Sequence, residues 1–220
     1  MKTKKLMLFA FRVAVAAAFA AVATLPLAAQ DRDRDWHQLR GTYFATGENL
    51  CLVSPAGFSS KLIPVDGAYV QSSSVQGILK FHANGTGTGQ QFEELMIAHP
   101  TPSSGFSPSA GSDEYSFPFT YTVADDGVLT FTAGLVSGTF PTGPFTGLTF
   151  SLTPPQQSGQ IARDRSAITL TSTVPTVETV TLALPPPPAG PGTTVAQVNR
   201  ICYRTRVLIP VHVPEDEDEE

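Results

Sequence analysis

Cysteine and positive charge are both scarce in this sequence. Its 220 residues include two cysteines, Cys51 and Cys202, and 14 lysines and arginines against 19 acidic residues. The two cysteines lack the Cys-x-x-Cys spacing that lowers a thiol pKa, so a redox site is not indicated. The region between the termini has no basic face on which a phosphate backbone could lie. We therefore do not expect nucleic acid as a partner.

Motifs that carry catalytic or metal chemistry are also missing. The four histidines lie far apart and lack the paired spacing of a metal site. No serine has the flanking glycines of a nucleophile elbow. The run Gly85-Thr-Gly87-Thr-Gly89 follows a turn, opens no predicted helix and contains no lysine, unlike a phosphate-binding loop. We predict no metal site, no cofactor and no catalytic residue, so the sequence favours a non-enzymatic function.

Long apolar runs are limited to the N-terminus. Three lysines, at positions 2, 4 and 5, precede an apolar stretch of 13 residues, Val13 to Leu25, which is followed by Pro-Leu-Ala-Ala. A membrane-spanning helix needs roughly 20 apolar residues, whereas this layout is typical of a secretory signal peptide. Cleavage after Ala29 would leave 191 of the 220 residues. We expect a secreted or periplasmic protein with no membrane span once the leader is removed.

The charge pattern suggests how the rest of the chain is divided. Residues 30–40 alternate in charge and are expected to fray. Residues 41–210 form a single domain in this interpretation. Residues 211–220 end in six consecutive acids and are expected to be a disordered tail.

Apolar and polar side chains alternate along most of the proposed domain. In residues 115–123 every second position is aromatic or β-branched, which is typical of a strand with one buried face. Asp125-Asp126-Gly127 then predicts a turn, and Asn84-Gly85 predicts a two-residue hairpin. Strand-like segments are expected at about 41–53, 75–82, 86–95, 115–124, 127–133, 145–152, 158–163, 166–172, 177–184 and 199–209. We therefore predict an all-β fold, an antiparallel up-and-down meander of eight to ten strands.

Such a sheet must close into a β-barrel or stack as a β-sandwich, because exposed edges invite aggregation. We favour the barrel because Cys51 and Cys202 lie in the first and last predicted strands, which are neighbours in a closed meander. In an exported protein the two thiols are expected to form a disulfide. Two unpaired buried thiols are the alternative. The acidic C-terminus does not favour an outer-membrane barrel, whose spans need about ten residues and aromatic girdles.

Alternation also predicts the interior. The inward residues would be Leu79, Phe81, Tyr115, Phe117, Phe119, Tyr121, Leu129, Phe131, Leu148, Phe150, Ile168, Leu170, Val180, Leu182, Ile201, Tyr203 and Val207. The aromatic residues among them that could contact a ligand are Phe117, Phe119, Tyr121, Phe131 and Phe150. Core packing is the alternative for each, because a small barrel can be filled by its own side chains.

Glu178 interrupts this apolar pattern. It shares a predicted strand face with Val180 and Leu182, and inside the barrel its carboxyl would have a raised pKa suited to acid–base chemistry. We expect it instead at the start of its strand, in water, because an isolated buried charge is costly.

The first and last strands contain Gly41-Thr-Tyr43 and Asn199-Arg-Ile-Cys-Tyr-Arg204-Thr-Arg206. A Gly-x-aromatic start with an arginine on the closing strand resembles the lipocalin-like (calycin-type) barrels, here a small exported bacterial form. The resemblance implies an interior that holds a small apolar molecule. It also implies that Tyr43 packs with Arg204 or Arg206 at the closed end of the barrel.

Three functions follow as hypotheses. The first is an exported binding module for a small apolar ligand. The second is a structural or protein-interaction domain with a solid core, whose Pro- and Ser-rich loop at 98–112 contacts another envelope protein. The third is a barrel isomerase or cyclase that uses Glu178.

Overall fold

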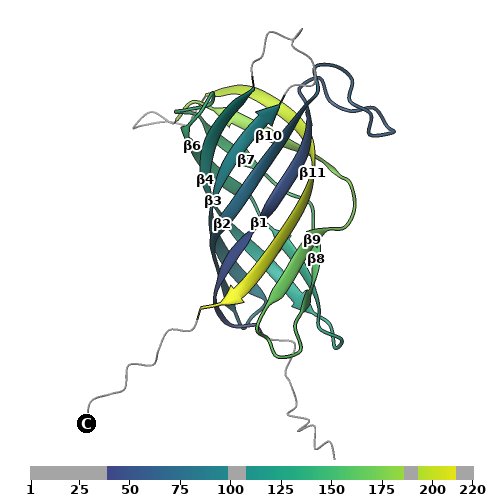
Figure 1. Cartoon of the computed structure of the whole chain (residues 1–220), viewed down its shortest axis with the longest axis vertical. Coiled ribbons are helices and arrows are strands. Elements are labelled where there is room, and N and C mark those ends of the chain that lie inside the picture. The colour runs from purple at the N-terminus through teal and green to yellow at the C-terminus, as the bar shows by residue number, and fades with distance from the viewer. Residues whose placement is uncertain (1–38, 99–107, 186–192, 212–220) are drawn as a thin grey trace, which may run out of the picture. The chain divides into compact units, whose positions relative to one another are not determined.

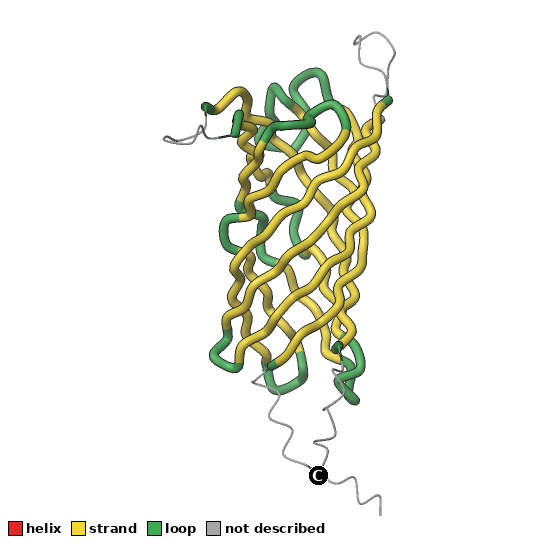
Figure 2. Tube along the Cα trace, turned by 90° about the vertical axis from the view of Figure 1, so that its left-hand side faces the viewer, coloured by secondary structure: helices red, strands yellow, loops and turns green. Residues whose placement is uncertain are grey.

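The computed structural model describes residues 39–98, 108–185 and 193–211 (Figure 1). Within these ranges it contains strands, turns and loops and no helix (Figure 2). The eleven strands are β1 (Gly41–Ser54), β2 (Tyr69–His82), β3 (Thr86–Ala98), β4 (Ser109–Val123), β5 (Val128–Ala133), β6 (Val136–Thr142), β7 (Thr149–Leu152), β8 (Gln157–Ile161), β9 (Ile168–Ser172), β10 (Val177–Ala183) and β11 (Thr194–Pro210). The predicted signal peptide and acidic tail, and most of the 98–112 loop, lie outside the described residues.

The strands form one closed antiparallel sheet. The hydrogen-bonded order β1-β2-β3-β4-β5-β8-β9-β11 returns to its start because β11 also pairs with β1. In Figure 1 the long strands run obliquely around the barrel, and each chain reversal joins neighbours in the sheet. The predicted all-β up-and-down barrel is confirmed, in place of the sandwich alternative.

Six of the strands are halves of three interrupted strands. β5 and β6 both pair with β4 and are separated only by residues 134 and 135. Residues 153–156 separate β7 from β8, and residues 173–176 separate β9 from β10. The sheet also closes where β6, β7 and β10 lie, because β6 pairs with β4 and β10 pairs with β11. The barrel therefore has eight strand positions around its wall, although it contains more separate strands than the eight to ten expected.

The interruptions lie side by side across the wall from β4 to β11. On β4 the break occurs at Pro118, which has no N–H to donate, while its carbonyl accepts a hydrogen bond from the Gly134 N–H at 2.8 Å. On β11 the break occurs near Arg204, whose N–H donates to the Ser172 hydroxyl at 3.1 Å. The sequence prediction missed β6 because Gly138 and Pro141 weaken its apolar alternation.

The hairpin at Asn84-Gly85 is one residue longer than predicted. β2 ends at His82 and β3 begins at Thr86, so the loop has three residues. Gly85 has a φ of 79°, and its N–H donates to the His82 carbonyl at 3.2 Å. Asn84 instead accepts hydrogen bonds from the backbone and hydroxyl of Thr86 through Oδ1. Only the glycine adopts the left-handed conformation.

One end of the barrel, which we name the closed end, is filled by aromatic rings. Phe81 lies at its centre, with ring centroids 5.1 Å from Tyr43, 4.9 Å from Phe119 and 5.1 Å from Tyr121 in edge-on contacts. The Tyr121 hydroxyl lies 2.6 Å from the Leu39 carbonyl oxygen. These side chains are buried and leave this end solid.

The predicted interior is correct on most strands and wrong on β11. Tyr203 is 58% exposed and Val207 40% exposed, and Ile201 is half-buried. The residues of β11 that face inward are Arg200, Cys202, Arg204, Arg206 and Leu208. The arginines tolerate this position because acidic residues of other strands pair with them inside the barrel.

Candidate ligand-binding site

A cavity of about 100 Å³ lies inside the barrel, beyond the closed end. One side of it is aromatic. The phenylalanines that line this side are Phe117, Phe131, Phe140, Phe145 and Phe150. Phe140 joins two of these rings, with centroids 5.4 Å from Phe145 and 4.9 Å from Phe150. Such a wall suits a flat apolar group.

The cavity contains three of the five aromatic residues predicted to contact a ligand. Phe117, Phe131 and Phe150 line it. Phe119 and Tyr121 belong instead to the solid closed end, where they pack on Phe81. The alternation of side chains correctly predicted that all five lie inside the barrel. Their position along the barrel axis decides which of them line the cavity and which pack in the closed end.

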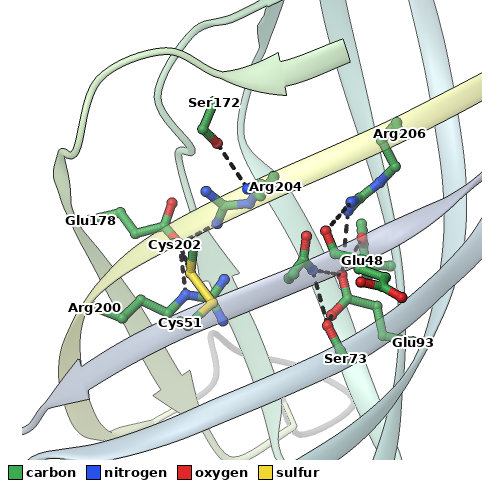
Figure 3. The surroundings of a disulfide bond; sticks show 12 residues. Glu48, Cys51, Ser73, Glu93, Ser172, Glu178, Arg200, Cys202, Arg204 and Arg206 are labelled. Atoms are coloured by element: carbon green, nitrogen blue, oxygen red, sulfur yellow. Dashed lines mark hydrogen bonds and ion pairs between the residues drawn. A yellow bond between two sulfur atoms is a disulfide. The ribbon is translucent and has the colours of Figure 1, made fainter. Parts of the chain in front are cut away.

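The expected disulfide joins two adjacent strands of the barrel wall (Figure 3). Cys51 on β1 and Cys202 on β11 are directly opposite each other in the strand register and are bonded, with an S–S distance of 2.05 Å. Val53, Tyr69 and Val198 pack around it. The bond ties the first strand to the last.

Glu178 is buried, contrary to the expectation that it lies in water. It is 4% exposed, and its Oε1 accepts hydrogen bonds from Arg200 Nε at 2.6 Å and from Arg204 Nη2 (Figure 3). Burial raises the pKa of this carboxyl, but the two guanidinium groups outweigh burial and leave the pKa below its ordinary value. Glu178 is thus an ionised partner for arginine and not the proton donor that a raised pKa would have made it.

A second carboxylate, Glu93 on β3, is held mainly by neutral donors. Its Oε1 accepts from Asn49 Nδ2 at 2.8 Å and from the Tyr115 hydroxyl at 2.5 Å, and its Oε2 accepts from the Ser73 hydroxyl at 2.8 Å. Arg206 Nη2 lies 3.9 Å from Oε1.

Asp113 on β4 lies directly opposite Glu93 in the strand register and is 6% exposed. Burial, and then the nearby charge of Glu93, raise the pKa of Asp113 to about 8, against a smaller opposite effect of Arg200. At neutral pH this side chain is therefore mostly a neutral carboxylic acid. It lines the cavity.

Several buried polar atoms in the described part of the chain have no hydrogen-bond partner. They are Asn49 Oδ1, Asp113 Oδ1, Gln157 Oε1, Glu178 Oε2 and Arg204 Nη1. Four of these five residues, all except Glu178, line the cavity. Unsatisfied buried polar atoms are costly, so the cavity wall offers both donors and acceptors to a polar group of a ligand.

The arginines of β11 do not meet Tyr43 as the lipocalin-like resemblance implied. Tyr43 is opposite Pro210, whereas Arg206 is opposite Gly47 and Arg204 is opposite Asn49. Both arginines lie among the polar residues beside the cavity. One sequence signal was missed: Arg204 and Arg206 share a strand face with Cys202, and so lie on the same side of the sheet as its disulfide partner Cys51.

Within 39–98, 108–185 and 193–211 no three His, Cys, Asp or Glu side chains are grouped so that they could hold a metal ion. The same ranges contain no helix with the length and apolar character needed to cross a bilayer.

Neither a protein-family model nor a curated protein matches the chain. Among solved structures, the chain is weakly similar to the enduracididine biosynthesis enzyme MppR. The form complexed with pyruvate has 10% sequence identity and a TM-score of 0.19, with 83% of this chain and 93% of that chain covered. The form with HEPES buffer bound has 10% identity and a TM-score of 0.17, with 88% and 94% covered.

Proposed function

We propose that this protein is an exported β-barrel binding module whose ligand is a small, largely apolar molecule held in the interior cavity. The observation that carries the proposal is the aromatic wall of Phe117, Phe131 and Phe150 around an interior space of about 100 Å³. An apolar cavity of roughly 150 Å³ in another protein holds benzene. The ligand expected here is thus about the size of one six-membered ring with a small substituent.

The closed barrel supports a binding function over a purely structural one. A domain that only contacts a partner through its loops needs no interior space, and cavities cost stability. Here the closed end is solid while the space lies between the aromatic wall and the polar cluster. The lipocalin-like resemblance of the first and last strands agrees with a ligand in this place.

Binding can be tested with toluene by saturation-transfer NMR on the oxidised protein, residues 30–220. We expect saturable binding that is lost in Ala133→Leu, because Ala133 is 6% exposed and lines the cavity. Ala98→Leu, at the exposed end of β3, is the matched control and should bind like the parent protein. Absence of toluene binding in the parent protein would overturn the proposal.

Export is tested separately. The proposed leader predicts that the protein recovered from outside the inner membrane begins at Gln30. Mass spectrometry of the intact protein measures this directly, and an uncleaved Met1 would contradict it.

A second candidate function is a barrel isomerase or cyclase, favoured by Asp113. A carboxylic acid that stays protonated near neutral pH beside an apolar cavity suits general acid catalysis. Asp113 replaces Glu178 in this role, because the arginines keep Glu178 ionised. Deuterium incorporation into 2-cyclohexenone in D₂O, compared between the parent protein and Asp113→Asn, tests it. Exchange no faster than in buffer alone would count against an enzyme.

A further inference from the structure

The polar side of the cavity has more positive than negative charge. β11 directs three arginines inward: Arg200, Arg204 and Arg206. Two carboxylates pair with them, Glu178 and Glu93, while Asp113 is mostly protonated at neutral pH. One positive charge is therefore left without a counter-charge in this cluster. A buried charge without a partner is costly, so the cluster favours an anion in the cavity.

Arg204 has a fully buried donor to spare. It is 5% exposed, and its Nη2 donates to Glu178 while its backbone N–H donates to Ser172 (Figure 3). Its Nη1 has no hydrogen-bond partner among the described residues. By contrast, Nη1 of Arg206 donates to the carbonyls of Glu48 and Thr205 at 3.1 and 2.7 Å. A guanidinium fixed by one carboxylate can present its remaining edge to a second one.

Resting on the proposed function, we infer that the ligand is a small carboxylic acid bound as its anion. Its apolar ring or chain lies against Phe117 and Phe150, and its carboxylate accepts a hydrogen bond from Arg204 Nη1. Asp113, as a protonated carboxyl lining the same cavity, supplies a second donor. The aromatic wall and the arginine cluster then bind the two parts of a single amphipathic molecule.

Benzoate and benzamide test this inference, because they have nearly the same shape and differ in charge. Calorimetric titration of the oxidised protein at pH 7 should show benzoate binding about tenfold or more tightly than benzamide, the range for a hydrogen bond to a charged group. Equal affinities would overturn the anion inference and leave the proposed apolar site intact. If neither these compounds nor toluene binds, the proposed function itself fails.

A charge-conserving pair of variants then assigns the donor. Arg204→Lys keeps one positive charge beside Glu178 but removes the forked donor, and it should reduce the preference for benzoate to about threefold or less. Arg40→Lys, at an exposed arginine that does not line the cavity, is the matched control and should keep the preference. Equal losses in both variants would overturn the assignment to Arg204. If Arg204→Lys does not fold, the benzoate-to-benzamide ratio of the parent protein still decides the inference.

Discussion

Arg204 and Glu178 are joined across the place where β11 changes its partner strand. β11 pairs with β10 as far as Ile201 and with β9 from Thr205 onward. Between these points the Arg204 N–H donates to the Ser172 hydroxyl at 3.1 Å, and its guanidinium donates to the Glu178 carboxylate. Side chains thus supply the contacts that a continuous strand ladder would have made.

Glu178→Gln should destabilise the barrel by about 3 kcal/mol or more, because it leaves Arg200 and Arg204 buried without their counter-charge. Urea unfolding at pH 7 measures this. Glu94→Gln changes an exposed side chain of β3 and should stay within about 0.5 kcal/mol of the parent protein. The lowered pKa also sets the pH window: the contribution of Glu178 is present above the ordinary carboxyl pKa of 4.5 and is lost as pH falls through the lower folded value. Equal effects of the two substitutions would contradict the buried ion pair.

Asp113→Asn should change how stability depends on pH. The folded protein holds a proton on Asp113 up to about pH 8, whereas the unfolded chain releases it near 3.8. The folded state therefore binds more protons in this window, and the parent protein loses stability as pH rises through it. The substituted side chain does not titrate. The free energy of unfolding of the variant, relative to that of the parent protein, should therefore increase from pH 4 to 8 by up to about 1.4 kcal/mol per pH unit.

The matched control for this experiment is Glu94→Gln, on the exposed face of β3. Its unfolding free energy should follow that of the parent protein across the same pH range. A constant difference between Asp113→Asn and the parent protein would show that Asp113 is ionised throughout.

Reduction of the disulfide should lower the free energy of unfolding by at most about 5 kcal/mol. Cys51 and Cys202 are 151 residues apart in sequence, so the bond restricts a very long loop of the unfolded chain. Urea unfolding with and without reductant gives the difference. The double variant Cys51→Ala/Cys202→Ala should resemble the reduced protein, and an unchanged midpoint in both would contradict a stabilising bond.

The orientation of β11 is testable with two of its side chains that lie on opposite faces. Leu208 is fully buried, and Leu208→Ala should cost about 2–5 kcal/mol because it leaves a cavity. Tyr203 is 58% exposed, and Tyr203→Ser should change stability by about 0.5 kcal/mol or less. Thermal unfolding compares them, and the reverse order would mean that Tyr203 faces the interior.

Strand positions were predictable because they depend on local alternation. The segment 115–123 has one aromatic face, and Phe117, Phe119 and Tyr121 are indeed buried. Closure was predictable from Cys51 and Cys202, since a bond between the outer strands of a meander brings its edges together. The interruptions were not predictable. Pro118 interrupts the pairing of β4 with β5 and β6 but not its pairing with β3, and the other interruptions lie in strands that are distant in sequence.

By itself, the sequence determined that alternating segments form an antiparallel sheet whose first and last strands meet. Only the tertiary structure decided which face of β11 lies inside, because both of its faces carry apolar residues, such as Tyr203 on one and Leu208 on the other. The arginines could be buried because the register of other strands brings Glu178 and Glu93 to them. Pairing of this kind depends on residues more than 20 positions away, and a local pattern contains no information about it.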